Sequence, residues 1–233
     1  MQTGSYIERR GELETYFDRT AAEAWSRLTS DAPVGRIRAT VRAGRERMRS
    51  ILLGCLPQDL RGTRLLDAGC GTGALAVEAA RRGAEVMAVD LSPTLVRLAQ
   101  ERQPRDLGAG SLRFQVGDMT DPALGTFDHV VAMDSLIHYE AEDAVAMLTR
   151  LSARSNGSLL FTFAPRTKPL AVMHAVGRLF PRGNRAPAIE PLKEIDLRRR
   201  LAMAEGLDGW QIGHSERVVN GFYTSQAVEL RRA

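Results

Sequence analysis

The sequence predicts an α/β protein with a doubly wound sheet of five parallel strands, finished by a C-terminal antiparallel hairpin. Three observations lead to this fold class. From residue 63, short apolar runs alternate with helical segments. A glycine-rich turn joins the first of these runs to its helix, and Asn220-Gly221 is a typical hairpin turn between two strand-like segments. The chain has 233 residues, which is enough for one domain with a sizeable core.

The helices and strands are expected in a regular order. Residues 5–30 and 34–56 are predicted to be helical, the second segment because apolar residues recur in it at spacings of three and four. Further strands are expected at Arg64–Asp67, Glu85–Asp90, Leu112–Val116, Phe127–Met133, Ser158–Phe163, Trp210–Val218 and Phe222–Leu230, and further helices at Ala74–Arg82, Ser92–Gln103, Ala141–Leu151 and 192–205. We interpret residues 1–55 as an N-terminal helical cover and residues 56–233 as one α/β domain.

Residues 164–191 interrupt this alternation. Prolines bracket an amphipathic stretch, Leu170–Phe180, that also carries basic residues. Open α/β sheets bind ligands beyond the carboxyl ends of their strands, and this insertion follows the fifth strand. We therefore expect residues 165–191 to form a lid over a ligand; the alternative is a surface helix whose apolar side packs on the sheet.

The basic residues are almost all arginines. Of the 32 lysines and arginines only Lys168 and Lys193 are lysines, and the net charge of +4 is too small to argue nucleic-acid binding. One side of the predicted helix 34–56 carries Arg36, Arg38, Arg42, Arg45, Arg47 and Arg49. This side fits a solvated face, an anion-binding face or a membrane-surface contact.

Other features point to a cytoplasmic protein. No apolar run is long enough to span a bilayer, and Met1–Arg10 is too polar for a secretory signal. The two cysteines, Cys55 and Cys70, cannot build a disulfide framework or a four-ligand zinc site.

The clearest chemistry lies in the segment Leu65–Gly73, which reads LLDAGCGTG. Its glycines end a strand and open a helix, so the backbone can approach a ligand closely and the helix N-terminus offers N–H groups to an anion. Asp67 can reach a cationic amino group. Taken alone the segment is ambiguous, because Gly69, Gly71 and Ala74 also satisfy the dinucleotide-binding pattern.

Two further acids stand at the ends of predicted strands. Asp90 ends the second strand, where a carboxylate can bind a ribose diol. Asp118 follows the third strand and can accept a hydrogen bond from an adenine amino group, with Met119 packed on the base. Each acid also has a purely structural explanation. Asp90 could be an acid at a helix N-terminus, and Asp118 could be an ordinary turn aspartate.

The combined spacing resembles the S-adenosylmethionine-dependent methyltransferase superfamily, with Asp-x-Gly-x-Gly-x-Gly after the first strand, an acid after the second and Gly-Asp after the third. The resemblance implies a Rossmann-like methyltransferase sheet and the cofactor S-adenosylmethionine, with S-adenosylhomocysteine as product. The cofactor-binding residues that it implies are Asp67, Gly69, Cys70, Gly71, Gly73, Asp90, Leu91, Asp118, Met119 and Met133. Arg42 is a further candidate for the cofactor carboxylate.

Nearly the whole chain resembles one branch of this superfamily, the magnesium-protoporphyrin IX methyltransferases of the bacteriochlorophyll pathway. The segments that carry the resemblance are Tyr16-Phe17 with Trp25, Arg42–Gly44, Asp67–Ala74, Asp134–Tyr139, Phe163–Thr167, Leu179–Pro181 and Gly221–Tyr223. It implies methylation of one porphyrin propionate, with the magnesium carried by the substrate and no metal bound by the protein. It also implies the magnesium chelatase large subunit as a partner, and it leaves peripheral contact with a membrane open.

Residues for the porphyrin are expected near the fourth strand and in the lid. His138 follows the fourth strand and is a candidate to position the propionate or the magnesium; a base is not needed, because a propionate is ionised at pH 7. Relatives of the chlorophyll branch often have a tyrosine where this chain has Thr29, and Tyr16 or Tyr139 is a candidate to replace it. Arg166 and Lys168 are further candidates for substrate binding.

Two other functions fit parts of the sequence. A quinone-pathway O-methyltransferase would resemble this chain over residues 63–134, but it would not need the family segments that follow residue 134. An RNA-modifying or RNA-binding protein could use the arginine-rich helix, but the chain has no catalytic Asn/Asp-Pro-Pro-Tyr motif after the fourth strand and no aromatic-rich basic surface. No nucleic-acid partner is therefore expected.

Overall fold

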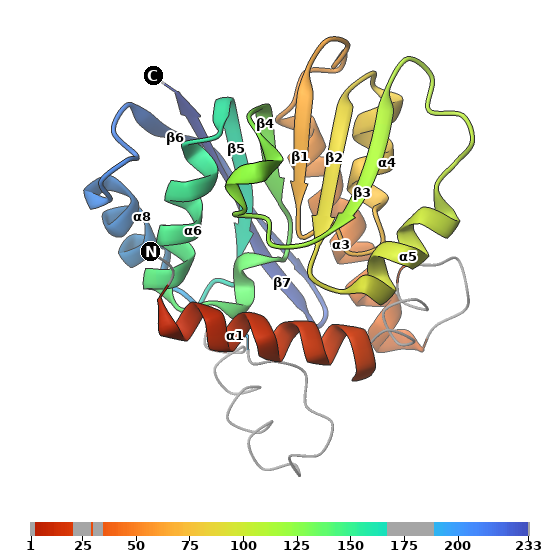
Figure 1. Cartoon of the computed structure of the whole chain (residues 1–233). Coiled ribbons are helices and arrows are strands. Elements are labelled where there is room, and N and C mark those ends of the chain that lie inside the picture. The colour runs from red at the N-terminus through yellow and green to blue at the C-terminus, as the bar shows by residue number, and fades with distance from the viewer. Residues whose placement is uncertain (1–2, 21–28, 30–34, 167–188, 233) are drawn as a thin grey trace.

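The computed structural model describes residues 3–20, 29, 35–166 and 189–232, and in this part of the chain seven strands form one sheet. The strands are β1 (Arg64–Ala68), β2 (Glu85–Asp90), β3 (Ser111–Val116), β4 (Phe127–Ala132), β5 (Ser155–Phe163), β6 (Trp210–Asn220) and β7 (Tyr223–Arg232). Their order is β3-β2-β1-β4-β5-β7-β6 (Figure 1). The first five are parallel and β7 is antiparallel to both neighbours, which confirms the predicted fold class.

Helices cover both faces of the sheet (Figure 1). The described helices are α1 (Gly4–Thr15), the π-helical turn η1 (Tyr16–Thr20), α3 (Arg36–Gly54), α4 (Ala74–Arg81), α5 (Pro93–Arg102), the 3-10 turns η2 (Pro122–Leu124) and η3 (Leu136–His138), α6 (Ala141–Ser152) and α8 (Glu194–Met203). Residues of α3, α4 and α5 pack in one core cluster, and residues of α1, α6 and α8 pack in the other. None of these helices is both long enough and apolar enough to cross a membrane.

The strand sequences explain why the sheet has two cores. Successive side chains of a strand point to opposite faces, so Leu65 packs in the core beneath α3 and α4 while Leu66 packs in the core beneath α6. Both leucines are fully buried. Strands buried on both faces are typical of parallel sheets, and they read as continuous apolar runs.

The N-terminal helices belong to these cores. Tyr6 and Leu13 of α1 are buried against one face, and Met48 and Leu52 of α3 against the other. In Figure 1, α1 runs across the ends of the strands instead of along the sheet. The predicted helical segment 5–30 is confirmed as far as Thr20, first as α1 and then as η1, and residues 21–28 lie outside the described chain.

The predicted apolar stripe of α3 also needs a correction at its first turn. Ile37 is 58% exposed, whereas Gly44 and Met48 are buried as expected. The reason is the contact with the hairpin formed by β6 and β7. A Cβ atom on Gly44 would lie 2.5 Å from the ring of Tyr223, and one on Gly221 would lie 2.5 Å from Thr40. The helix therefore meets the hairpin at Thr40 and Gly44, and Ile37 projects past it.

Several other boundaries differ from the sequence expectation by one to three residues. Asn220 pairs with Tyr223, so the hairpin turn is Gly221-Phe222 and not Asn220-Gly221. Gly221 has φ +58°, which suits the first central position of a type II′ turn. β5 begins at Ser155, three residues earlier than expected, and α8 begins at Glu194 because Leu192 forms a parallel bridge with Pro165. Most of the expected lid, residues 167–188, lies outside the described chain.

Candidate functional site

A cavity of about 620 Å³ lies at the carboxyl ends of the parallel strands. Its floor is formed by the segments that follow β1, β2, β3 and β4, and its walls by α1 and η1 on one side and by α3 with the tip of the β6–β7 hairpin on the other. This is the edge at which open α/β sheets bind ligands. The cavity brings together all of the predicted cofactor residues except Gly73, which lies beneath the floor and is buried.

The glycine loop needs its glycines for two reasons. Gly69, Gly71 and Gly73 have φ angles of 85°, 54° and 79°, a region that other residues rarely adopt. In addition, a Cβ atom on Gly69 would lie 2.4 Å from Cβ of Ser135, and one on Gly73 would lie 2.5 Å from Phe114. The backbone N–H groups of Gly69 and Cys70 donate to the carbonyl of Val89, which fixes the loop against β2.

Asp67 and Asp90 lie side by side beneath this loop. Asp67 is 2% exposed, and its Oδ2 atom is buried with no hydrogen-bond partner among the described residues. Burial, together with the nearby Asp90, raises the pKa of Asp67 to about 7. Asp90 accepts hydrogen bonds from the N–H groups of Gly71 at 2.8 Å and Ser92 at 3.0 Å, but burial still raises its pKa. Such a pair of buried carboxyl groups favours a cationic ligand.

Cys70 is half-buried in the same loop and lines the cavity. Burial and the two neighbouring aspartates raise the pKa of its thiol well above the ordinary value. The thiol therefore stays protonated at neutral pH. Cys70 lines the ligand space without supplying a nucleophile.

Asp118 connects the third strand to α1. It accepts hydrogen bonds from Tyr6 Oη at 2.9 Å and from Thr120, and its Oδ2 atom pairs with Arg10 at 3.1 Å. Burial acts to raise its pKa, but these hydrogen bonds outweigh burial and hold the pKa below the usual value. The roles of Tyr6 and Arg10 could not be found from the sequence. A helical pattern does not show which strand the helix will contact, and here α1 contacts the segment after β3.

The predicted substrate residues separate into two groups. His138 is 8% exposed, lines the cavity from η3 and meets Phe17 edge to face, with ring centroids 5.9 Å apart. Tyr16 also lines the cavity. By contrast, Arg166 is exposed and is not among the residues that line the cavity, and Lys168 lies outside the described chain.

Tyr139, which follows His138, is 2% exposed and stacks on Tyr6 with ring centroids 5.5 Å apart. Burial, with smaller contributions from Tyr6 and Asp118, raises the pKa of its hydroxyl. A buried phenol of this kind holds the η3 segment against α1. It is poorly suited to accept or release a proton at neutral pH.

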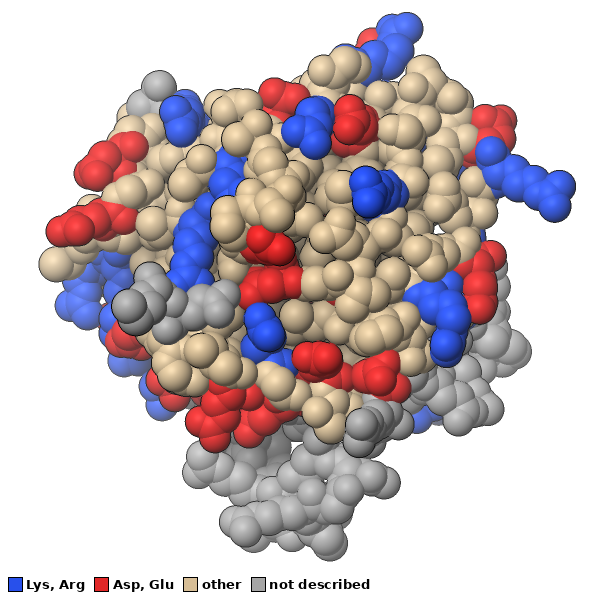
Figure 2. Space-filling view, viewed as in Figure 1, with Lys and Arg blue, Asp and Glu red and all other residues tan. Residues whose placement is uncertain are grey.

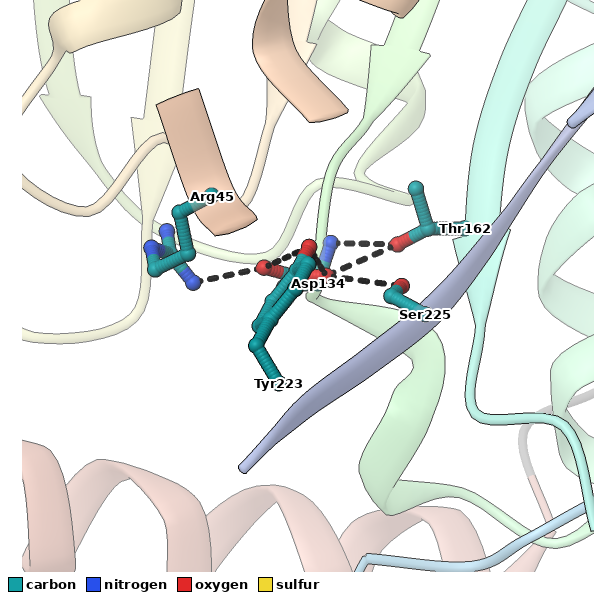
Figure 3. A network of polar contacts seen from close by, with 5 residues as sticks. All are labelled: Arg45, Asp134, Thr162, Tyr223 and Ser225. Carbon is teal, nitrogen blue, oxygen red and sulfur yellow. Dashed lines mark hydrogen bonds and ion pairs between the residues drawn. The ribbon is translucent and has the colours of Figure 1, made fainter. Parts of the chain in front are cut away.

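Asp134 is the main site residue for which sequence reasoning gave no role (Figure 3). Its side chain is 5% exposed and pairs with Arg45 of α3 at 2.6 Å. It also accepts hydrogen bonds from Tyr223 and Ser225 of β7 and from Thr162 of β5, whose own Oγ1 accepts from the Asp134 N–H. Its φ of 54° is the one positive value among the described non-glycine residues. Asp134 thus joins α3, β5 and β7 at the end of β4.

The arginine face of α3 turns toward the cavity. Arg38, Arg42, Arg45 and Arg49 all line it, together with Glu46, whereas Arg36 and Arg47 do not. The spacing of four, three and four residues places these four arginines on one side of a helix. That spacing was visible in the sequence, but it could not show whether this side meets solvent or a ligand.

The outer surface carries charges of both signs. On the face shown in Figure 2, Lys and Arg side chains are interspersed with Asp and Glu and form no continuous basic patch. The lower edge of that face, where Figure 1 places α1, is mainly acidic. The exposed acids Glu8, Glu12 and Glu14 belong to this helix. Within the described chain, no group of three or more His, Cys, Asp and Glu residues could hold a metal ion.

Comparisons with known proteins agree with this geometry. Residues 132–232 match the family model described as "Magnesium-protoporphyrin IX methyltransferase C-terminus", and residues 65–155 match a "Methyltransferase domain". A magnesium-protoporphyrin O-methyltransferase of Rhodobacter capsulatus is 49% identical over 97% of this chain and 98% of its own length. A ubiquinone biosynthesis O-methyltransferase of Xanthomonas oryzae is 35% identical, but over only 54% of this chain and 55% of its own length.

A solved structure resembles this chain over nearly its whole length. The crystal structure of a magnesium protoporphyrin IX methyltransferase from Synechocystis with bound S-adenosylhomocysteine superimposes with a TM-score of 0.81. It is 30% identical in sequence, and the match covers 96% of this chain and 100% of that one. The likeness therefore extends over the sheet, the N-terminal helices and the C-terminal hairpin together.

Proposed function

Since the chain belongs to the magnesium-protoporphyrin O-methyltransferase family, we propose that its cavity holds S-adenosylmethionine and magnesium protoporphyrin IX together, so that one propionate receives the methyl group. The chain is an S-adenosylmethionine-dependent methyltransferase of the chlorophyll pathway, and the product of this reaction is the porphyrin monomethyl ester. The proposal depends most on one observation, the buried and unpartnered Oδ2 atom of Asp67 in a cavity that also contains His138. The quinone-pathway alternative is disfavoured, because such a relative matches only about half of the chain.

The acidic floor of the cavity suits the cofactor. S-adenosylmethionine has a cationic amino group, which would satisfy Asp67 Oδ2, and a ribose diol, which would lie at Asp90. Its adenine would lie between Asp118 and Met119, and Leu91 and Met133 complete the lining. Arg42 on the opposite wall is the candidate for the cofactor carboxylate. Because α1 contacts Asp118, the adenine end of this site lies against the N-terminal cover.

The chemistry requires little from the protein beyond position. The cofactor supplies a methyl group on a positively charged sulfur, and a propionate with a pKa near that of Glu, about 4.3, is already an anion at pH 7. No proton has to be removed. Holding the two reactants in line can lower the activation free energy by roughly 7–11 kcal/mol. His138 would orient the porphyrin through its propionate or its magnesium, and Tyr16 would contact the macrocycle.

The direct test is a methyl-transfer assay with labelled S-adenosylmethionine. Magnesium protoporphyrin, metal-free protoporphyrin and a catechol serve as parallel acceptors. We expect label in the porphyrin ester and none in the catechol. Transfer to the catechol alone would replace the proposed function by a quinone-pathway activity.

Replacing Asp90 by Ala is expected to weaken S-adenosylmethionine binding by about 1.5–3 kcal/mol, the typical contribution of hydrogen bonds to a charged group. Isothermal titration calorimetry measures this change. Asp59→Ala is the matched control, because Asp59 is an exposed acid that pairs with Arg61 and does not line the cavity. An unchanged affinity in Asp90→Ala would remove Asp90 from the cofactor site.

Replacing His138 by Ala is expected to lower turnover at least tenfold, with little change in cofactor affinity, because the imidazole lines the cavity and we propose that it orients the porphyrin. The measurements are kcat with both porphyrins and calorimetry with the cofactor. If His138 contacts magnesium, the loss is much smaller with metal-free protoporphyrin. Equal losses with both porphyrins would instead support the propionate contact. His214→Ala, at an exposed histidine of β6, serves as the control.

Other parts of the proposed function stay predictions. Residues 1–55 and 165–191 are proposed to cover the bound ligands, since α1, η1 and α3 form the walls of the cavity. The magnesium chelatase large subunit as a donor of the porphyrin, a cytoplasmic location and peripheral membrane contact rest on the family resemblance and on the sequence.

A further inference from the structure

The arginine wall of α3 is too extensive for the cofactor carboxylate alone. Arg38, Arg42, Arg45 and Arg49 line the cavity over three turns of the helix, with Glu46 as the one carboxylate on the same wall. Arg45 is held by Asp134, which neutralises it. Arg42 is the candidate for the cofactor carboxylate. Arg38 and Arg49 therefore remain as cations that neither contact accounts for.

The two remaining arginines lie at opposite ends of the wall. They are eleven residues apart, which corresponds to about 16 Å along a helix. Arg49 lies toward the C-terminal half of α3, which packs against α4. Arg38 lies near the tip of the hairpin, because Gly221 meets α3 at Thr40. Within the described chain Arg38 forms no ion pair and is exposed.

The surroundings of Arg38 combine charge with apolar surface. Val41 of α3 and Phe222 of the hairpin tip line the same cavity, and Phe222 is 53% exposed. A cavity lined by an exposed phenylalanine and an exposed cation is suited to a flat apolar molecule with an anionic edge. The helix on the other wall, α1, is less suitable for an anionic edge, because it carries the exposed acids Glu8, Glu12 and Glu14.

The substrate of the proposed function has two propionates, of which one is methylated. The second stays ionised at neutral pH, since its pKa is near that of Glu, about 4.3. Placing this charge against the apolar surface of Val41 and Phe222 is costly unless a cation receives it. Resting on the proposed function, we propose that Arg38 binds the second, unreacted propionate and so makes the enzyme selective for a porphyrin with two carboxylates.

Arg38→Gln is the test, with Arg47→Gln as the matched control. Arg47 is on the same helix, is exposed, pairs with Glu216 and does not line the cavity. The two acceptors are magnesium protoporphyrin and an analogue whose unreacted propionate is capped as a methyl amide. Steady-state kinetics gives KM and kcat for each acceptor. Quenching of porphyrin fluorescence in the presence of S-adenosylhomocysteine gives a dissociation constant that does not depend on turnover.

With magnesium protoporphyrin, Arg38→Gln is expected to raise KM and the dissociation constant about tenfold and to change kcat less than twofold. A tenfold change corresponds to the loss of about one charge-assisted hydrogen bond. Wild-type enzyme should show the same tenfold loss with the capped analogue, and Arg38→Gln should then cause no further loss. Cofactor affinity should be unchanged in both variants.

The inference is overturned if Arg38→Gln behaves like Arg47→Gln, or if it weakens both acceptors by the same factor. Both results leave the proposed function intact, because wild-type enzyme still methylates magnesium protoporphyrin. Failure of the wild type to methylate that porphyrin would overturn the proposed function, and this inference with it.

Discussion

Replacing Asp67 by Asn should reduce the decline in stability that we expect for the unliganded protein between pH 4 and pH 7, to which Asp90 also contributes because its pKa is raised as well. The folded pKa of Asp67 is about 7, above the ordinary 3.8, because the carboxyl group is buried beside Asp90. At a pH between 3.8 and about 7, the Asp67 carboxyl group is ionised in the unfolded chain but still protonated in the folded chain. Raising the pH therefore favours unfolding, by roughly 4 kcal/mol in total for a shift of this size.

Urea denaturation at several pH values measures this slope. Asp59→Asn is the control, because hydrogen bonds from Arg61 lower the pKa of Asp59 to about 2. That shift acts below pH 4 and leaves the window from pH 4 to 7 unchanged. If wild type and Asp67→Asn lose stability equally across this window, the buried carboxyl group is not the cause.

The same substitution should weaken S-adenosylmethionine binding, and the loss should be greater at pH 8 than at pH 6. Above pH 7 the wild-type carboxylate is charged and can pair with the cofactor amino group; below pH 7 it has lost that charge. Calorimetry at the two pH values compares the variants. Binding that is equally tight in both proteins at pH 8 would contradict the proposed contact.

Replacing Asp134 by Ala should destabilise the protein by about 3–5 kcal/mol, because the change breaks the buried ion pair with Arg45. For a protein of this size the melting temperature should fall by on the order of 10 °C. The hydroxyls of Tyr223 and Ser225 lose an acceptor at the same time. Urea denaturation and thermal melting measure the loss.

Two further variants separate the causes of this loss. Asp134→Gly removes the same side chain but relieves the left-handed backbone, so it should be about 1 kcal/mol more stable than Asp134→Ala. Combining Asp134→Asn with Arg45→Gln should cost less than the sum of the single changes, because the two charges depend on each other. Strictly additive losses would mean that the pair contributes nothing as a pair.

The part of the site that the sequence predicts well is the part built from local segments. The glycine loop, Asp67, Asp90 and Asp118 each follow a strand, and parallel strands bring their carboxyl ends to one edge. Their shared location therefore follows from the order of strands alone. The register of the hairpin was wrong by one residue, because either Asn220 or Gly221 can open a two-residue turn and the pairing of β6 with β7 decides between them.

The contacts that the sequence could not predict are those between distant elements. Asp134 receives Arg45 from α3, Thr162 from β5 and Tyr223 from β7, and its own segment shows none of these partners. Its positive φ was equally hidden, although aspartate is among the residue types that tolerate this conformation. The arginine spacing on α3 was visible, but only the packing of the helix decides that it faces the cavity.

The fit between Gly44 and Tyr223 also bears on how such proteins diverge. A Cβ atom at position 44 would lie 2.5 Å from the tyrosine ring, so a larger side chain at position 44 requires the residue at position 223 to move or to become smaller. A substitution at one position is therefore tolerated only after, or together with, a compensating one at the other. In an alignment of homologues, side-chain volumes at these two positions should vary inversely, and lineages that enlarge residue 44 should have lost the aromatic ring at residue 223.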